Sequence, residues 1–261
     1  IAEKGLFWQK DGEDGMEISI GGHGFRVTIN SYMAAEAATL SKIAHWKNDN
    51  QAQALETEAC RIKENMFKYL WDPKAEFLKV LSVEKNASLK DVRELHGYTP
   101  WAFDLASADY AVAWKFLMNT RHFLAPYGPT TAEQCHPQFK VAYEGHECQW
   151  NGPSWTMLST RHQKPEERGK DYNHSLFCDL VINGLIGIRP SEEEELDVNP
   201  LIPEGYWDYF CLDNLTYRGK TICVLYDKTG DKYKRGAGLS IFINGTKTAT
   251  SPTLTKISCK L

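Results

Sequence analysis

The sequence has 261 residues, of which 42% are hydrophobic and 25% are charged, and its formal net charge at pH 7 is −4. This composition is typical of a folded chain that buries a core, as one large domain or as one domain with a small companion. The charge balance gives no electrostatic footprint for nucleic acid and no apolar run is long enough to span a bilayer, so neither a nucleic acid nor a membrane is expected as a partner.

A glycine-rich loop comes first in the chain. Residues 11–24 combine glycines with acidic side chains: Gly12, Gly15, Gly21, Gly22, Gly24, Asp11, Asp14 and Glu17. Glycine permits backbone conformations that other residues resist, so we expect a shaped loop here rather than the interior of a helix or strand.

Two helices are predicted next. Asn30–Trp46 has a face of small residues, mostly alanine, which allows close packing against a neighbour. Asp49–Leu70 has apolar residues near helical spacing, and Asp72-Pro73 ends it. The pair predicts a helical hairpin.

Shorter elements follow as far as Pro190. We expect an extended segment at Phe77–Val83 and helices at Pro100–Leu105, Tyr110–Met118, Gly152–His162 and Asn173–Ile188. Residues 121–143 are expected to be irregular, because three prolines interrupt them.

The pattern changes after Pro190. Short runs rich in β-forming residues alternate with turn signals, and Asn244-Gly245 between two such runs is a strong hairpin signal. We therefore expect a mainly α domain over residues 1–190 and a small antiparallel β domain over residues 191–261.

The cysteines signal neither a disulfide framework nor a structural zinc site. Their number, seven, is odd, and no CxxC motif occurs. Cys211 and Cys223 could face each other across two strands. The spacing of Cys135, His136, His146 and Cys148 matches no common zinc pattern, and the sequence has no Walker loop, nucleophile elbow or dinucleotide fingerprint. We expect no metal and no cofactor.

The segment Asp11–Glu17 (DGEDGME) is a candidate catalytic loop. It follows Phe7-Trp8, so carboxylates lie beside an aromatic ring of the kind that stacks on the apolar face of a sugar. Asp14 stands between flexible positions and could point into a pocket. The alternative is a polar surface turn, which Asp-Gly pairs commonly form.

The segment Glu144–Trp155 (EGHECQWNGPSW) is a candidate binding cleft. It combines two acids and two tryptophans with a histidine, a glutamine and an asparagine. A core would avoid so many polar groups, and a plain surface would avoid two tryptophans. It is either one wall of a cleft or a loop whose tryptophans pack on the core. Arg93–Trp101 (RELHGYTPW) offers similar chemistry.

Several of these segments resemble known glycosidases. Gln149–Trp155 (QWNGPSW) resembles the Gln-Trp-Asp-x-Pro signature of trehalases and a Trp-x-Gly-Pro segment of glycoside hydrolase family 63. A wider set resembles the mannosylglycerate-hydrolase-like glycosidases: DGMEISIGG (14–22), TINSYM (28–33), RELHGYTPWAF (93–103), YGPTTAEQ (127–134), EGHECQWNGPSW (144–155), KDYNHS (170–175) and NPLIPEGYWDYFCLDNLTY (199–217). The resemblance covers nearly the whole chain.

The resemblance implies a fold and a reaction. The fold is a partial (α/α)6 toroid of the six-hairpin type, followed by a β-sandwich-like tail. The reaction is inverting hydrolysis of a terminal sugar, with a carbohydrate as substrate and with Asp14 as the acid. The substrate-binding residues implied are Trp8, Glu17, Arg26, Tyr98, Trp101, Glu147, Gln149, Trp150 and Trp155.

The resemblance also shows what this chain departs from. The base of such enzymes follows a further helical hairpin, but the segment between Arg161 and Tyr172 is too short to hold one. Glu166 and Glu167 fall there without a matching motif. The helices predicted before Pro190 are also too few for six hairpins, so we expect a missing N-terminal half or a self-partner. The chain is then either a hydrolase or an inactive carbohydrate-binding or interaction module.

Overall fold

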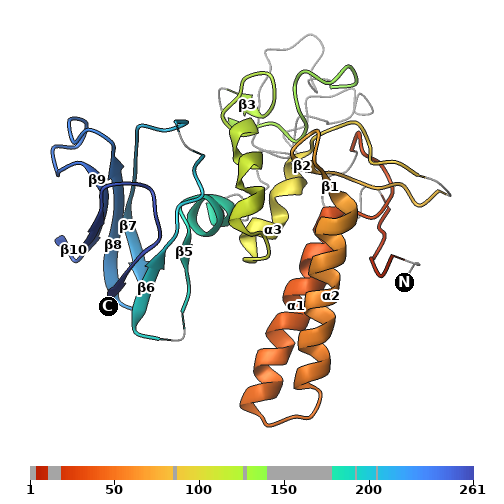
Figure 1. Ribbon diagram of the computed structural model, residues 1–261, viewed down its shortest axis with the longest axis horizontal. Helices are drawn as coiled ribbons and strands as arrows, with labels where there is room; N and C mark the ends of the chain where they lie inside the picture. Colours follow the sequence, from red (N-terminus) through yellow and green to blue (C-terminus); the bar gives the residue numbers. More distant parts are fainter. Residues whose placement is uncertain are drawn as a thin grey trace, which may run out of the picture. The chain divides into compact units, whose positions relative to one another are not determined.

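The computed structural model describes residues 4–10, 19–84, 87–125, 128–139, 178–191, 193–203 and 205–261. The chain forms two compact units, Ile1–Phe177 and Cys178–Leu261. Helices dominate the described part of the first unit and strands that of the second (Figure 1). The units divide before Pro190 because β5, Ile188–Arg189, pairs with β6, Glu195–Val198, inside the second unit.

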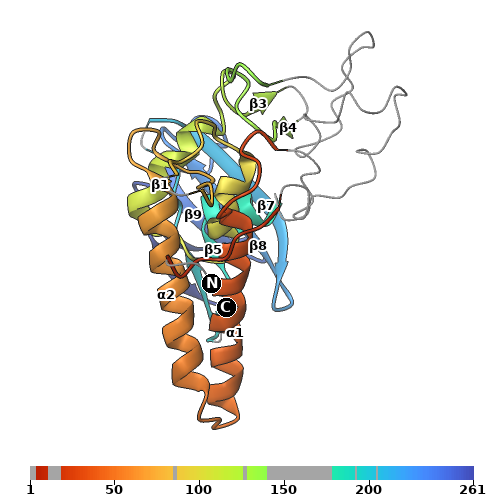
Figure 2. The same cartoon turned by 90° about the vertical axis from the view of Figure 1, so that its right-hand side faces the viewer.

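The first unit contains the predicted helical hairpin. α1 spans Val27–Trp46 and α2 spans Ala52–Leu70, and the two lie side by side in both views (Figures 1 and 2). The buried face of α1 is built from small residues, including Ala34, Ala37 and Ser41, which let the helix axes approach closely. The Ser41 hydroxyl donates a hydrogen bond to the Ala52 carbonyl at 2.9 Å. Among the described residues, no helix combines the length and the apolar character that crossing a bilayer requires.

The rest of the described first unit is short elements around an aromatic core. They are β1 (Trp71–Asp72), β2 (Phe77–Leu78), η1 (Leu95–Tyr98), α3 (Thr99–Ala102), η2 (Ala108–Phe116), β3 (Leu124–Ala125) and β4 (Gly128–Pro129). β1 pairs with β2 and β3 with β4. Tyr98 stacks on Trp114, with ring centroids 4.6 Å apart, and meets the edge of Phe77 at 5.0 Å. This cluster is the core on which η1, α3 and η2 pack.

The second unit contains two small antiparallel sheets, preceded by the short helix η3 (Leu180–Leu185). One has the order β11-β6-β5, with β11 at Ile257–Lys260. The other has the order β10-β9-β8-β7, with β7 at Tyr209–Tyr217, β8 at Lys220–Asp227, β9 at Gly238–Ile243 and β10 at Thr246–Ser251. The expected antiparallel β region is thus present, as two sheets.

Residue alternation explains the four-stranded sheet. Ile222 and Val224 are fully buried and pair with Ile243 and Ile241, so these side chains line one apolar face. The predicted hairpin at Asn244-Gly245 is confirmed. Asn244 and Gly245 have φ values of 49° and 80°, the positive values that a two-residue turn of this kind requires.

Gly187 lies in close contact with the backbone of Asn199, so a substitution at Gly187 tests how the second unit is packed. Its φ is 79°, and a Cβ there would lie 1.9 Å from the Asn199 carbonyl oxygen. Gly219 has a similar φ of 73°, and no described atom lies within 4 Å of its Cβ position. We expect Gly219→Ala to cost about 1 kcal/mol from backbone strain alone and Gly187→Ala to cost about 3 kcal/mol. Urea unfolding of both variants measures the difference, and equal losses would contradict the close contact.

Candidate functional site

Backbone hydrogen bonds hold the residues that flank the acidic segment, Asp11–Glu17. The Gln9 N–H donates to the Gly24 carbonyl at 2.8 Å, and the Gly24 N–H donates to the Gln9 carbonyl at 3.1 Å. The next residue, Phe25, pairs in the same way with Leu81, at 2.8 and 3.2 Å. Residues 11–18, which include Asp14 and Glu17, lie outside the described residues. The two ends of that segment are therefore held by long-range backbone pairing.

A buried carboxylate holds the backbone directly after the acidic segment. Glu94 is 2% exposed, and its Oε1 accepts the N–H groups of Ile20 at 2.9 Å and Gly21 at 3.2 Å. Its Oε2 lies 3.1 Å from Nε2 of His96. A Cβ at Gly21 would lie 2.4 Å from that second oxygen, so only glycine lets the backbone approach this closely.

Arg26 holds the same stretch of backbone from the helix side. It is completely buried immediately before α1, and its Nη1 donates to the Ser19 hydroxyl at 2.9 Å and to the Gly22 carbonyl at 2.7 Å. Together these groups form what we call the loop anchor: Ser19, Gly21, Gly22, Arg26, Glu94 and His96. The sequence implied a sugar-binding role for Arg26, and the structure places it in this anchor.

The charge state of Glu94 follows from its surroundings. Burial raises the pKa of its carboxyl, but the hydrogen bond and charge of His96, the charge of Arg26 and the Gly21 N–H lower it by more. The pKa of Glu94 therefore lies below its ordinary value, and the group is an anion at neutral pH. A buried anion of this kind is tolerated because each of its oxygens has partners.

The four described aromatic or basic candidates fall into different environments. Trp8 is 55% exposed at the base of the acidic segment, where a ligand can reach its ring. Tyr98 is completely buried, its hydroxyl donates to the Ala113 carbonyl at 2.8 Å, and burial raises its pKa well above the ordinary value. Trp101 is 1% exposed, and its indole N–H has no hydrogen-bond partner among the described residues. The structure thus brings Arg26 to the anchor, leaves Trp8 at the surface and packs the other two rings in the core.

The remaining candidates fall outside the described residues. They are Asp14, Glu17, Glu147, Gln149, Trp150 and Trp155. The segment between Arg161 and Tyr172, in which a base was sought, lies outside them too. The role of each stays a prediction.

A second buried acid, Glu133, joins two of the sequence segments. Its Oε2 lies 2.7 Å from Nη1 of Arg93 and 2.9 Å from Nδ1 of His122, and its Oε1 accepts the Arg93 N–H at 2.9 Å. Cys135 Sγ lies 3.7 Å from the same Oε2 and 3.8 Å from the same Nδ1. Burial, opposed and outweighed by the hydrogen bonds and charge of Arg93 and by His122, leaves the pKa of Glu133 below its ordinary value.

This cluster fits a structural role better than a chemical one. A nucleophilic thiol triad needs the thiol and the acid at different ring nitrogens of the histidine, whereas here both meet Nδ1. Arg93 also donates from Nε and Nη2 to the Ala75 carbonyl at 3.1 and 2.9 Å, so the guanidinium is fixed beside the carboxylate that a metal ion would need. Glu133 therefore ties Arg93 to the chain near His122.

Sequence reasoning placed Glu94 in the candidate segment Arg93–Trp101 without assigning it a role, and it did not single out Glu133. The available signal was an acid close to His96, Tyr98 and Trp101 in the sequence, and another in YGPTTAEQ. Adjacent residues Arg93 and Glu94 reach different partners, Glu133 and the loop anchor, because they lie on an extended segment with alternating side-chain directions.

Comparisons with known proteins match both parts of the chain. A profile of the mannosylglycerate hydrolase MGH1-like glycoside hydrolase domain matches residues 2–161, and one of the glycosyl hydrolase family 65 C-terminal domain matches residues 188–249. A solved structure described as a sialidase is 35% identical, with a TM-score of 0.64, over 99% of this chain and 29% of its own. The chain thus spans less than a third of that protein's length.

Two further solved structures, both from Thermus thermophilus, are more distant. A GH63 mannosylglycerate hydrolase in complex with glucose is 16% identical, with a TM-score of 0.38, over 47% of this chain and 30% of its own. An uncharacterized conserved protein is 14% identical, with a TM-score of 0.41, over 47% of this chain and 31% of its own. Their similarity is too low to carry an argument about the site.

The loop anchor predicts a pH-dependent stability. Glu94→Gln preserves the shape of the side chain but removes its charge, and we expect a loss of about 3 kcal/mol in the free energy of unfolding at pH 7. Since the folded pKa of Glu94 is below the unfolded value of about 4.3, its charge stabilises the fold above that pH. This contribution is lost as the pH falls toward the folded pKa, so the difference between variant and wild type shrinks in acid.

A matched control is Glu58→Gln on α2. Glu58 also has a lowered pKa, chiefly from the side-chain hydrogen bond of Arg61, but its side chain is 40% exposed. We expect a loss of no more than about 0.5 kcal/mol there. Urea unfolding of the two variants, measured at steps of ~1 pH unit between pH 3 and pH 7, distinguishes their effects. A pH-independent effect at Glu94, or equal losses at both sites, would contradict the anchor.

Proposed function

Since the chain belongs to the mannosylglycerate hydrolase MGH1-like glycoside hydrolase domain family, we propose that it acts on a terminal sugar of an oligosaccharide or glycoside by an inverting acid/base mechanism. The profile match confirms the family that the sequence motifs indicated. The observation that carries the proposal is the loop anchor. Glu94 and Arg26 bind the backbone of residues 20–22, and Arg26 also binds the Ser19 hydroxyl, so they hold the chain directly after the acidic segment.

In the proposed mechanism Asp14 is the acid. It protonates the glycosidic oxygen as the bond to the sugar breaks, which requires a carboxyl with a raised pKa in a partly dry pocket. Glu17 lies three residues further on and is proposed to contact sugar hydroxyls, and Trp8 offers its exposed ring to the apolar sugar face. The loop anchor serves this chemistry by positioning, because a small displacement of an acid from its target costs much of its rate advantage.

The opposite wall of the pocket is proposed to come from Glu144–Trp155. Trp150 and Trp155 supply stacking surfaces, and Glu147 and Gln149 supply hydrogen bonds. The indole N–H of Trp101, which has no hydrogen-bond partner among the described residues, is proposed as a further donor to a residue of this wall. In this proposal Tyr98 supports the site from the core, because its hydroxyl is engaged by Ala113.

The proposed architecture is a partial (α/α)6 toroid with a β tail. α1 and α2 form one of its helical hairpins, and the second unit corresponds to the tail. The sequence predicted domains at residues 1–190 and 191–261, and we propose that the boundary lies before β5, because β5 pairs with β6 inside the second unit. The match of residues 188–249 to the family 65 C-terminal domain supports a tail that begins close to that boundary.

The alternative is a catalytically inactive carbohydrate-binding or interaction module. This alternative is supported by the segment between Arg161 and Tyr172. The segment is too short for the helical hairpin that precedes the base in the glycosidases that this sequence resembles. Glu166 and Glu167 are the carboxylates available there. A chain without a base can still bind a sugar at Trp8 and the tryptophan-rich wall.

Carboxamide variants of the acidic segment test the mechanism. We expect Asp14→Asn to lower the rate of sugar release from a panel of glycosides at least about 100-fold, because it removes the proton donor, with glycan affinity retained. Glu17→Gln should chiefly raise KM, and Asp11→Asn, in the same segment, is the matched control. Full activity in Asp14→Asn would overturn the assignment, and loss of kcat in Glu17→Gln instead would transfer the acid role to Glu17.

Assays of the unmodified chain separate the two functions. Inversion of the anomeric centre, followed by NMR of the released sugar, supports the hydrolase. Glycan binding by calorimetry with no sugar released from the whole panel supports the binding module. Absence of both would overturn both proposals.

An exposed apolar stripe on α1 supports a helical partner. Leu40, Ile43 and Trp46 are 45%, 36% and 67% exposed, and their spacing of three residues puts them on one face of the helix. Exposed clusters of large apolar side chains mark interaction surfaces. We propose that this face packs on a further helical hairpin, contributed either by a missing N-terminal half or by a second copy of the chain.

Sedimentation equilibrium tests the self-association. We expect a dimer for the unmodified chain and a weakening of at least about tenfold in the triple variant Leu40→Ser/Ile43→Ser/Trp46→Ser, because each buried apolar side chain contributes roughly 1.5–3 kcal/mol. The control is Glu36→Ser/Lys42→Ser, which changes exposed polar residues of the same helix. A monomeric unmodified chain, or equal association of both variants, would exclude this face as a self-interface.

A further inference from the structure

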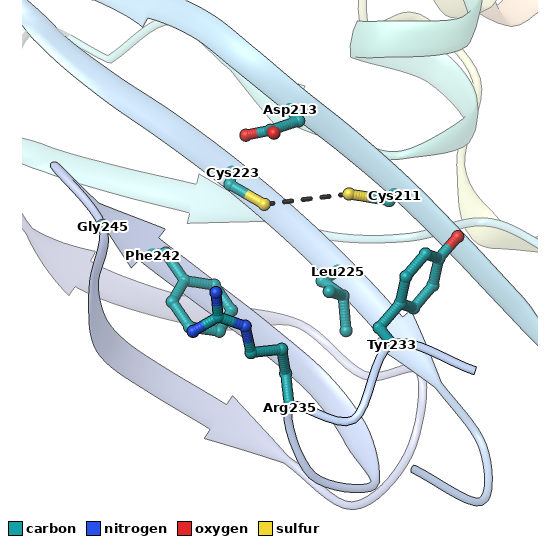
Figure 3. Close-up of a pocket in the computed structure, with 8 residues that line it drawn as sticks. All are labelled: Cys211, Asp213, Cys223, Leu225, Tyr233, Arg235, Phe242 and Gly245. Atoms are coloured by element: carbon teal, nitrogen blue, oxygen red, sulfur yellow. Dashed lines mark hydrogen bonds between the residues drawn. The ribbon is translucent and has the colours of Figure 1, made fainter. Parts of the chain in front are cut away.

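A small pocket lies on the four-stranded sheet of the second unit (Figure 3). Its lining comes from β7, β8, β9 and the loop between β8 and β9, and no residue of the proposed glycosidase site belongs to it. Its volume is about 250 Å³, below the ~300–1,000 Å³ of most sites for drug-sized ligands. The pocket therefore suits one small ring rather than a nucleotide or an extended cofactor.

The floor of the pocket is apolar. Leu225 on β8 and Phe242 on β9 both line it and are buried. They lie on the face of the sheet opposite Ile222 and Val224, because successive side chains of a strand point to alternate faces. A floor of this kind suits the C–H face of a ring better than an ion.

Two thiols extend this surface toward β7. Cys211 on β7 and Cys223 on β8 form a thiol–thiol hydrogen bond with their Sγ atoms 3.8 Å apart. The sequence suggested that the two cysteines could face each other, and the structure confirms that they do. Burial, then the charge and hydrogen bond of Cys211 and those of Asp213, raise the pKa of the Cys223 thiol to about 12. Cys223 is therefore an uncharged thiol at neutral pH and behaves as a small apolar side chain.

Tyr233 forms an aromatic wall of the pocket. Asp227, at the end of β8, accepts the backbone N–H of Gly230 at 2.9 Å and that of Tyr233 at 2.8 Å, which fixes the loop that carries the ring. The ring also meets the edge of Tyr209, with centroids 6.1 Å apart. Burial, and then the neighbouring groups Cys211 and Tyr209, raise the pKa of the Tyr233 hydroxyl, so it remains a hydrogen-bond donor. A ring held in place in this way lowers the entropic cost of binding a ligand.

The two ends of the pocket carry opposite charges. Figure 3 shows the Asp213 carboxylate on the side of Cys223 and the Arg235 guanidinium at the other end. Asp213 Oδ1 accepts the Asn214 N–H at 2.8 Å, and Lys247 Nζ donates to the Arg235 carbonyl at 2.6 Å, so the backbone at each end is fixed. A hydroxyl group can donate to the carboxylate at one end and accept from the guanidinium at the other. A ligand with hydroxyl groups around a ring can therefore satisfy both ends.

We propose that this pocket binds one unit of a neutral sugar and is a second carbohydrate site, carried by the β unit. The sugar's apolar C–H face packs on the floor and on Tyr233, and its hydroxyls bind Asp213 and Arg235. A charged ligand fits less well, because an anion meets the carboxylate of Asp213 and a cation meets the guanidinium of Arg235. The glycoside hydrolase family of the chain makes a sugar the hydroxylated ring expected here. Binding at this site does not depend on the proposed acid/base reaction.

The test is protection of Cys211, an exposed thiol in the lining of the pocket. The reduced full chain is alkylated with iodoacetamide, with and without the methyl glycosides of glucose, mannose and galactose, and the rate at each cysteine is mapped by peptide mass spectrometry. We expect at least one glycoside to slow the reaction of Cys211 about tenfold at ~10 times its Kd, where roughly one site in ten stays free. Cys60 on α2 and Cys259 on β11 are the internal controls and should react at unchanged rates.

Variants assign the protection to the pocket. Tyr233→Leu and Arg235→Ala should each raise the Kd, read from the same protection curve, at least about tenfold, and Asp213→Asn about fivefold, because each loses a hydrogen-bonding group or its charge. The matched control is Lys234→Ala, which changes an exposed residue of the same loop outside the lining. Trp8→Ala, in the first unit, should also leave this Kd unchanged. Circular dichroism checks the fold of every variant.

Several results would overturn the proposal. One is no protection of Cys211 by any of the three glycosides at about 20 mM, far above a Kd of about 1 mM. Another is protection by glucuronic acid alone, which would assign an anionic ligand. Unchanged affinity in both Tyr233→Leu and Arg235→Ala, or loss of protection in Trp8→Ala, would place the binding elsewhere. Full activity in Asp14→Asn, by contrast, contradicts only the proposed reaction and leaves this second site intact.

Discussion

The buried carboxylate of Glu94 is the constraint on which the first unit depends. An anion in the interior is costly unless its oxygens are bonded, and this one is satisfied by two backbone N–H groups and His96. Those partners come from residues more than seventy positions earlier and from the same short segment. Because Glu94 needs these hydrogen bonds, the backbone directly after the acidic segment must lie against the start of η1. Arg26 binds the same stretch of backbone from the other side.

Several further features follow from that contact. Gly21 must be glycine for the backbone to reach the carboxylate, and Gly24 must approach Leu81, where a Cβ would lie 2.4 Å from the carbonyl oxygen. α1 begins one residue after Arg26, so the anchor also sets where the helical hairpin starts. The neighbouring Arg93 binds Glu133, which extends the same polar framework toward β3 and β4. The contacts of the loop anchor and those of Glu133 thus meet at the adjacent residues Arg93 and Glu94.

The second unit is organised on a different principle. Its larger sheet separates an apolar face, with Ile222 and Val224, from a face that carries Cys211, Cys223 and Asp213. Successive side chains of β8 point to opposite faces of the sheet, and this alternation decides which side chains can meet on one face. Leu225 and Phe242 are also buried on the face that carries the cysteines, so both faces of this sheet contribute to hydrophobic stabilisation.

Local sequence patterns determined the helical hairpin, the Asn244-Gly245 turn and the antiparallel character of the second unit, because spacing and turn chemistry act over a few residues. They also identified the segments that carry the family resemblance. Only the tertiary structure decided that Tyr98 and Trp101 pack in the core while Trp8 stays exposed, since an aromatic residue suits either environment. It alone decided that Glu94 and Arg26 hold one loop, and that β5 joins the second unit. These outcomes depend on contacts between residues far apart in the chain, for which the periodicity of a single segment contains no information.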